Sequence, residues 1–152
     1  MSSSAIRLCA AIALGVTIAA PAAAQDLLWH APEAVLELPG ATDGDGITRR
    51  PLLRHEDAVI AARASVPPNS EVQPHAHPAG KVALVTVLSG EIELALGDEY
   101  DAARLQTVPP GSLVVFRADD PQHFARTGPN GAELLIVAAP AEAIVPEVLG
   151  AE

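Results

Sequence analysis

The stretch that decides the fold runs Gln73-Pro-His-Ala-His-Pro-Ala-Gly-Lys-Val-Ala-Leu-Val-Thr-Val-Leu-Ser-Gly-Glu-Ile-Glu-Leu-Ala-Leu96. Two histidines one residue apart, His75 and His77, lead into an apolar run that is rich in β-branched residues. In an extended chain, side chains at i and i+2 point to the same face, with their Cα atoms about 6–7 Å apart. Two imidazoles at that separation can converge on one metal ion. The alternative is a pair of polar residues in a surface turn.

The residues after the histidine pair predict two strands joined by a tight turn. Ser89-Gly90 is typical of a hairpin turn, and 91–96 alternates polar and apolar residues. The alternation places Glu91 and Glu93 on the face opposite the core. We therefore predict that both glutamates are solvated.

Outward from this stretch, short apolar runs alternate with Gly- and Pro-rich turns. Further strands are predicted over 58–66, 113–117, 123–127 and 133–138. Pro129-Asn130-Gly131 predicts a second hairpin turn. The segment 26–38 predicts an edge strand or arm, with Trp29 as a packing residue, and the residues after Pro140 a loosely packed tail.

Composition agrees with an all-β domain. The chain has 14 Pro and 11 Gly, which interrupt every long apolar period, so no amphipathic helix of ordinary length is predicted. Several short strands at intervals of about ten residues are typical of a β-sandwich or a small barrel.

The first 24 residues have the features of a secretory signal peptide. A short start containing Arg7 is followed by the apolar, uncharged run 8–20 and by the small residues of Pro21-Ala22-Ala23-Ala24. The run is shorter than the roughly 20 residues that a membrane helix needs. We expect cleavage after about Ala24, a periplasmic or secreted mature chain, and one domain over residues 25–152. Cys9 is the single cysteine, so the mature chain has no disulfide and depends on its core.

The charge of the chain excludes two classes of partner. Its formal charge is −10, and loss of Arg7 with the signal peptide makes it −11. Lys81 is its single lysine. Phosphate contacts need clustered Lys or Arg, so we expect neither nucleic acid nor an anionic membrane surface as a partner.

The motifs in this chain resemble those of the cupin superfamily. The similarity extends over about 38–140 and is carried by the histidine pair, Val85-Thr-Val-Leu-Ser-Gly90, Leu96-Gly-Asp-Glu-Tyr-Asp101, Pro110-Gly-Ser-Leu-Val-Val-Phe116 and His123-Phe-Ala125. The resemblance implies a single-domain cupin jelly-roll β-barrel. Many activities share that fold, so the fold by itself names no reaction. The resemblance also implies that the protein can form a homodimer.

The family's functional positions are matched in part. His75 and His77 match the histidine pair of the first cupin motif, and His123 matches the histidine of the second. Ala83 stands where the metal-binding glutamate of the first motif belongs. The resemblance thus implies three histidine ligands for a divalent transition metal: iron, zinc, nickel or copper. Gln73 is a candidate fourth contact, and His30 and His55 have no motif around them.

Two functions remain open at this point. One is a small metal-dependent oxygenase or isomerase that acts on a small organic molecule, with catalytic residues not assigned. The other is a non-catalytic binding module that has lost its metal and binds a small ligand.

By strand parity, Ala83 shares a face with Val85 and Val87, and its small methyl group is expected to leave space beside the imidazoles.

Overall fold

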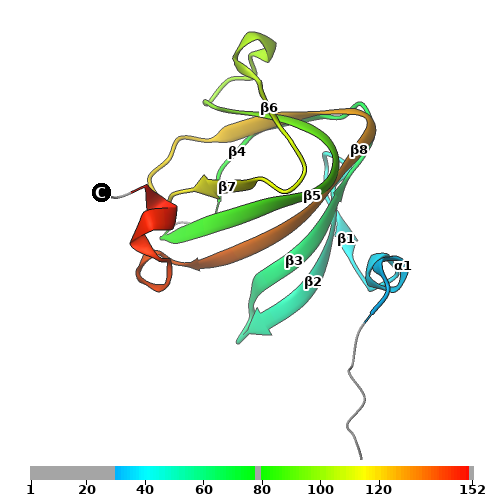
Figure 1. The fold of residues 1–152 in the computed structure, drawn as a ribbon, viewed down its shortest axis with the longest axis vertical. Helices are drawn as coiled ribbons and strands as arrows, with labels where there is room; N and C mark the ends of the chain where they lie inside the picture. The colour runs from blue at the N-terminus through cyan, green and yellow to red at the C-terminus, as the bar shows by residue number, and fades with distance from the viewer. Residues whose placement is uncertain (1–29, 78–79, 151–152) are drawn as a thin grey trace, which may run out of the picture.

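A computed structural model describes residues 30–77 and 80–150 (Figure 1). The predicted signal peptide, its cleavage site and Trp29 lie outside the described residues. The elements are α1 (Pro32–Leu36), β1 (Ala41–Thr42), β2 (Thr48–His55), β3 (Ala58–Val66), β4 (Glu71–His75), β5 (Lys81–Leu96), η1 (Ala102–Arg104), β6 (Gln106–Val108), β7 (Leu113–Phe116), β8 (His123–Pro140), η2 (Ala141–Ala143) and η3 (Pro146–Leu149). The all-β jelly-roll prediction is confirmed. No helix in the described part of the chain is long and apolar enough to cross a membrane.

Two long strands, β5 and β8, form the centre of the fold. They pair antiparallel from Lys81↔Pro140 to Leu96↔His123 and bend over together (Figure 1). The first half of β5 also pairs with β7, and its second half pairs with β6. On β8, the C-terminal half pairs with β3 and the N-terminal half with β4. The two halves therefore belong to two facing layers, and the space between the layers is the barrel interior.

Both predicted hairpin turns are wrong, because the chain bends at these points without reversing. Gly90 and Ala132 are cross-strand partners within the continuous β5–β8 ladder, and the ladder shifts register on both sides of Gly90. Gly90 has φ +86° and Gly131 has φ +67°, which glycine adopts without a steric penalty. A Cβ at Gly90 would collide with the Gly131 carbonyl oxygen and lie 2.8 Å from Ala132 Cα. The two glycines thus allow β5 and β8 to bend at the same point while their backbones stay in contact.

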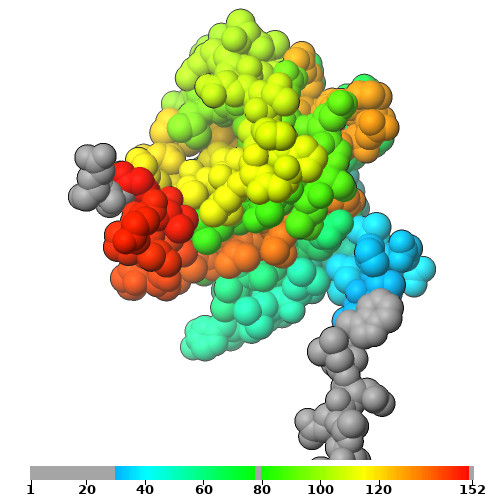
Figure 2. All heavy atoms as spheres, in the orientation of Figure 1, coloured from blue at the N-terminus to red at the C-terminus, as the bar shows by residue number. Residues whose placement is uncertain are grey.

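The ends of the chain also differ from the sequence prediction. Within 30–38 the chain forms the short helix α1 in place of an edge strand, and Pro32 favours this because proline suits the first helical turn. The predicted loose tail forms η2 and η3 and lies against the segment that contains β7 (Figure 2). There Arg117 Nη2 donates a 2.7 Å hydrogen bond to the Leu149 carbonyl oxygen.

The remaining local predictions agree with the structure. The strand predicted over 58–66 is β3, with the same bounds. Glu91 is exposed, and Glu93 forms an ion pair with Arg126 on the outer face, while Ile92 between them is buried. The main buried cluster consists of inward side chains of the two layers, among them Val85, Val87 and Phe116. Phe124 and Val82 are below 2% exposure but lie outside this cluster.

Candidate functional site

Three segments bring the histidines to one place. His75 is the last residue of β4, His123 is the first residue of β8, and the two are cross-strand partners. His77 follows two residues after His75. The ring centroids lie 4.1 Å apart for His75 and His123, 4.7 Å for His77 and His123, and 6.2 Å for His75 and His77. The structure therefore brings the three predicted side chains together, with His123 nearest to both of the others.

Phe116, the last residue of β7, completes this ring cluster. Its ring is stacked on His123 with centroids 4.0 Å apart, and lies 4.9 Å from His77. The planes of His77 and His123 differ by 11°. Apolar stacking of this kind removes the imidazoles from water, and His123 is 7% exposed.

The hydrogen bonds of the imidazoles leave nitrogen lone pairs available. His75 Nδ1 lies 2.9 Å from the Gln73 carbonyl oxygen. Because a carbonyl oxygen only accepts, Nδ1 carries the proton there and Nε2 of the neutral ring has a free lone pair. His77 Nε2 is buried and has no hydrogen-bond partner among the described residues. A buried nitrogen without a partner is costly unless a ligand satisfies it.

Burial keeps two of the imidazoles neutral. It lowers the pKa of His123 to about 3, helped by repulsion from His75, His77 and Arg49. Burial, then repulsion from His75 and Arg49, lowers the pKa of His77 to about 4. At neutral pH both rings are therefore in the unprotonated form that a metal or a hydrogen-bond donor requires.

The histidines border a cavity of about 360 Å³ inside the barrel. Aliphatic side chains from β3, β5 and β8 form most of its wall; the lining residues are Ile47, Arg49, Val59, Ala62, Ala64, Val66, Val72, His75, Ala76, His77, Val85, Ile92, Leu94, Phe116, His123, Ala125, Leu134, Ile136 and Ala138. A largely apolar wall with a few convergent polar groups is typical of a small-molecule site.

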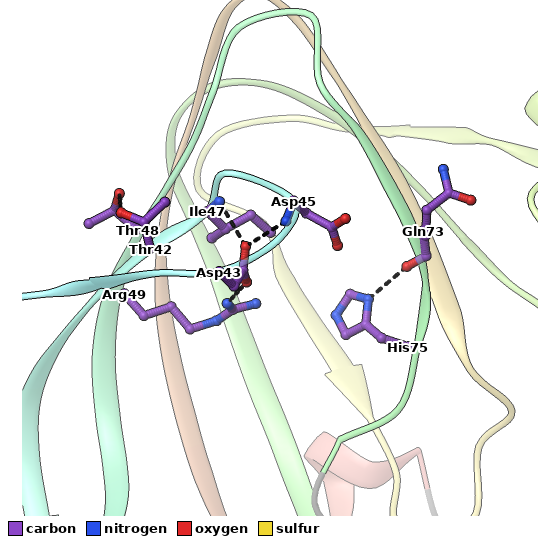
Figure 3. Close-up of polar contacts among 8 residues, drawn as sticks. All are labelled: Thr42, Asp43, Asp45, Ile47, Thr48, Arg49, Gln73 and His75. Atoms are coloured by element: carbon purple, nitrogen blue, oxygen red, sulfur yellow. Dashed lines mark hydrogen bonds and ion pairs between the residues drawn. The ribbon is translucent and has the colours of Figure 1, made fainter.

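Arg49 on β2 is a cavity residue that sequence reasoning missed. It forms an ion pair with Asp43, whose Oδ1 also accepts the N–H groups of Asp45 (3.1 Å) and Ile47 (2.9 Å) (Figure 3). Alternation along β2 requires that Arg49 and Arg50 face opposite sides. That signal was available, but nothing in the sequence says which of the two faces inward.

Gln73 does not reach the site with its side chain. The side chain is exposed and does not line the cavity; only its carbonyl oxygen contacts His75 (Figure 3). The reason is a register shift in β4 between Val72 and His75. Val72 and His75 both line the cavity although they are three residues apart, so the simple alternation that paired Gln73 with His75 is broken there. His30 and His55 are exposed, as expected.

Ala83 has the predicted parity but does not open onto the cavity. It is 1% exposed and belongs to the same buried cluster as Val85 and Val87, yet of these three only Val85 lines the cavity. Its cross-strand partner on β7 is Phe116, whose ring lies on His123. The expectation of open space at position 83 is therefore wrong, because an aromatic side chain lies beside it.

The nitrogen donors are suitable ligands for a transition metal, but the observed orientations of the rings do not point them at one site. Three neutral imidazoles are suitable ligands for zinc, iron, nickel or copper. Over residues 30–77 and 80–150, however, no three side chains of His, Cys, Asp or Glu are arranged to hold a metal ion. A metal lies close to the plane of each imidazole that binds it, and the stacked planes of His77 and His123 share no nearby point. Binding by all three therefore requires at least one ring to rotate.

Comparison with known proteins agrees with the architecture. The model of a family described as "Cupin domain" matches residues 62–138. No curated protein is similar enough to the chain to count as a relative.

Several solved structures share the fold at low sequence identity. The cupin domain of Cnp3 from Schizosaccharomyces pombe is 11% identical, with a TM-score of 0.57 over 78% of this chain and 79% of that one. The polyketide cyclase RemF from Streptomyces resistomycificus is 23% identical, with a TM-score of 0.55 over 75% and 79%. A predicted oxalate decarboxylase from Thermotoga maritima is 20% identical, with a TM-score of 0.50 over 70% and 96%.

Proposed function

The chain belongs to the cupin family, and from this premise we propose that it binds a small organic molecule in the barrel cavity beside a divalent transition metal held by His75, His77 and His123. One observation carries the proposal: two imidazoles at or just after the end of β4 and one at the start of β8 meet at the wall of an apolar cavity, and His77 Nε2 is buried there without a partner among the described residues. When bound, such a metal supplies Lewis-acid or redox chemistry.

The other residues of the site then have defined tasks. The Gln73 carbonyl orients the His75 ring and holds its proton on Nδ1, as a second partner commonly does for a ligating imidazole. The aliphatic wall excludes water and takes the apolar part of the ligand. One structural relative is a polyketide cyclase and another a predicted oxalate decarboxylase, which supports an enzymatic use of the cavity without naming the reaction.

Metal titration tests the proposal. Protein made without a histidine tag is stripped with EDTA and titrated by calorimetry with zinc, nickel or copper, and with iron(II) under anaerobic conditions. We expect one metal ion per chain. His77→Ala and His123→Ala should each weaken the affinity by more than about 100-fold, whereas His55→Ala, at an exposed histidine of β2, should bind as the parent does. Binding unchanged in His77→Ala, or no binding by the parent, would reject the site.

A metal-free binding module is the second candidate. The observation that favours it is the stacked arrangement of His77, His123 and Phe116, in which the imidazoles pack on one another and on an aromatic ring and do not converge on one point. The same calorimetry distinguishes the two candidates. A parent protein that takes up no metal at pH 7.5, yet still binds small organic ligands in EDTA, would be such a module.

We also propose that the mature chain begins near Gln25 and is exported to the periplasm or secreted. The support is the uncharged apolar run 8–20 followed by Ala22-Ala23-Ala24. N-terminal sequencing of the exported protein tests it. A soluble mature protein that still begins at Met1 or Ser2 would contradict it.

A further inference from the structure

One residue that lines the cavity, Arg49, has a permanent charge, and that charge is positive. Among the lining residues Arg49 is the only Lys or Arg, and none is Asp or Glu. Arg49 therefore places a cationic hydrogen-bond donor at the wall of an apolar space.

The position of Arg49 follows from strand pairing. On β2 it is the cross-strand partner of Ala64 on β3, and directly paired residues share one face of the sheet. Ala64 is 1% exposed and lines the cavity, so the Arg49 side chain leaves the sheet on the interior side. Figure 3 shows Arg49 and His75 on opposite sides of the turn formed by Asp43–Ile47.

Asp43 fixes the guanidinium without using all of its donors. Its Oδ2 pairs with Arg49 Nη1, and its Oδ1 holds the turn through the N–H groups of Asp45 and Ile47. A guanidinium has five N–H donors in a planar fork, which matches the two oxygens of a carboxylate. Neither Nε nor Nη2 of Arg49 has a hydrogen-bond partner among the described residues. An edge of the group is therefore free for a ligand.

We propose that the cavity binds a small organic monocarboxylate with an aliphatic body, and that Arg49 is the residue that selects the carboxylate. The inference rests on the proposed function in that it concerns the same cavity, and it assigns the acid group to Arg49 and not to the metal. A carboxylate enters an apolar site at high cost unless it is paired there, and a guanidinium supplies the pairing. The protein as a whole repels anions, with a formal charge of −10, so the selection is local to this residue.

Calorimetry with three probes tests the assignment. Butyrate, hexanoate and hexanamide are titrated into the EDTA-treated protein and into the zinc-loaded protein at pH 7.5. We expect hexanoate to bind at least about tenfold more tightly than hexanamide, which has the same body without the charge. Butyrate should bind about 15-fold more weakly than hexanoate, since each buried methylene contributes about fourfold.

Two arginine variants from the same strand localise the effect. Arg49→Gln should reduce hexanoate affinity to the level of hexanamide and leave hexanamide binding unchanged. Arg54→Gln, at an exposed position of β2, should bind all probes as the parent does. Circular dichroism and the melting temperature check that Arg49→Gln is folded, because this change also removes the partner of Asp43.

The outcomes separate this inference from the metal proposal. Equal binding of hexanoate and hexanamide, full hexanoate binding by Arg49→Gln, or no binding of any probe would overturn it. Hexanoate binding that requires zinc and is unchanged in Arg49→Gln would also overturn it, since the metal would then bind the carboxylate. Arg49→Gln should still bind zinc, at least as tightly as the parent, because it removes a positive charge that acts on His77 and His123. If no metal binds, but hexanoate binding still depends on Arg49, the metal proposal fails and the assignment of Arg49 stands.

Discussion

Acidification should destabilise the metal-free protein through two histidines, the buried His123 and the half-buried His77. The folded-state pKa is about 4 for His77 and about 3 for His123, against an ordinary value of 6.5 for each. Because the folded pKa values are depressed, the unfolded chain binds more protons below pH 6.5. Stability is therefore complete above about pH 6.5 and falls as the pH drops toward 4 and then 3.

The size of the effect follows from the two pKa differences. At pH 5 an unfolded histidine is about 97% protonated, whereas His77 in the folded protein is about 9% protonated and His123 about 1%. The difference corresponds to about 2 kcal/mol at pH 5 for His123. His77 is only half-buried, so solvent screening reduces its share to about 1 kcal/mol, and the two together cost about 3 kcal/mol relative to pH 8. That is a large part of the roughly 5–15 kcal/mol by which a typical domain is stable.

Urea unfolding in EDTA at pH 8, 7, 6 and 5 measures this loss. EDTA is needed because a bound metal would itself hold the imidazoles neutral. Burial acts to raise the pKa of Asp43, but the hydrogen bonds from Arg49 and from backbone N–H groups, with the charge of Arg49, outweigh it and lower that pKa. The stability due to Asp43 is therefore lost only below about pH 4.

The control and the contradicting result are both clear. His55→Gln, at an exposed position, should lose the same free energy of unfolding between pH 8 and pH 5 as the parent. An NMR titration of the imidazole protons gives the folded pKa values directly. A parent protein whose stability at pH 5 lies within about 1 kcal/mol of that at pH 8, or rings that titrate near pH 6.5, would refute the reasoning.

Three substitutions test the packing around the site. Gly90→Ala should lower the free energy of unfolding by at least about 2 kcal/mol in urea, because φ is +86° and the Gly131 backbone fills the space. Gly44→Ala, where nothing lies near the added Cβ, should change the free energy of unfolding little in the same assay. Phe116→Ala should lower the free energy of unfolding by about 3–5 kcal/mol, since Phe116 is 5% exposed and its ring packs on two histidines. Leu113→Ala, at an exposed position of the same strand, should lower it far less, and equal losses would contradict the ring cluster. Ala83→Glu buries an unpaired carboxylate beside Phe116, so it should destabilise the metal-free protein in the same urea assay. Because position 83 does not line the cavity, zinc affinity should not rise; tighter zinc binding would show that residue 83 reaches the histidines.

Local pattern was sufficient for the elements themselves. The β-branched run 58–66 predicts β3 with its observed bounds, because one side of that strand is buried and alternation reports this directly. His75, His77 and His123 are also visible in the sequence as a motif, and the structure gathers them.

Only the tertiary structure decided what the turns and the arginines do. A Ser-Gly or Asn-Gly pair supplies positive φ, but whether the chain then reverses or bends depends on the strand opposite, here Gly131 and Ala132 opposite Gly90. The β4 register shift, which turns Gln73 outward, and the inward position of Arg49 also depend on pairing with distant strands. The pKa values of His77 and His123 have the same origin, because they are set by burial against Phe116 and one another across elements about forty residues apart. Residue type and spacing determine which side chains can act, whereas long-range contacts determine which of them face the cavity and in what charge state.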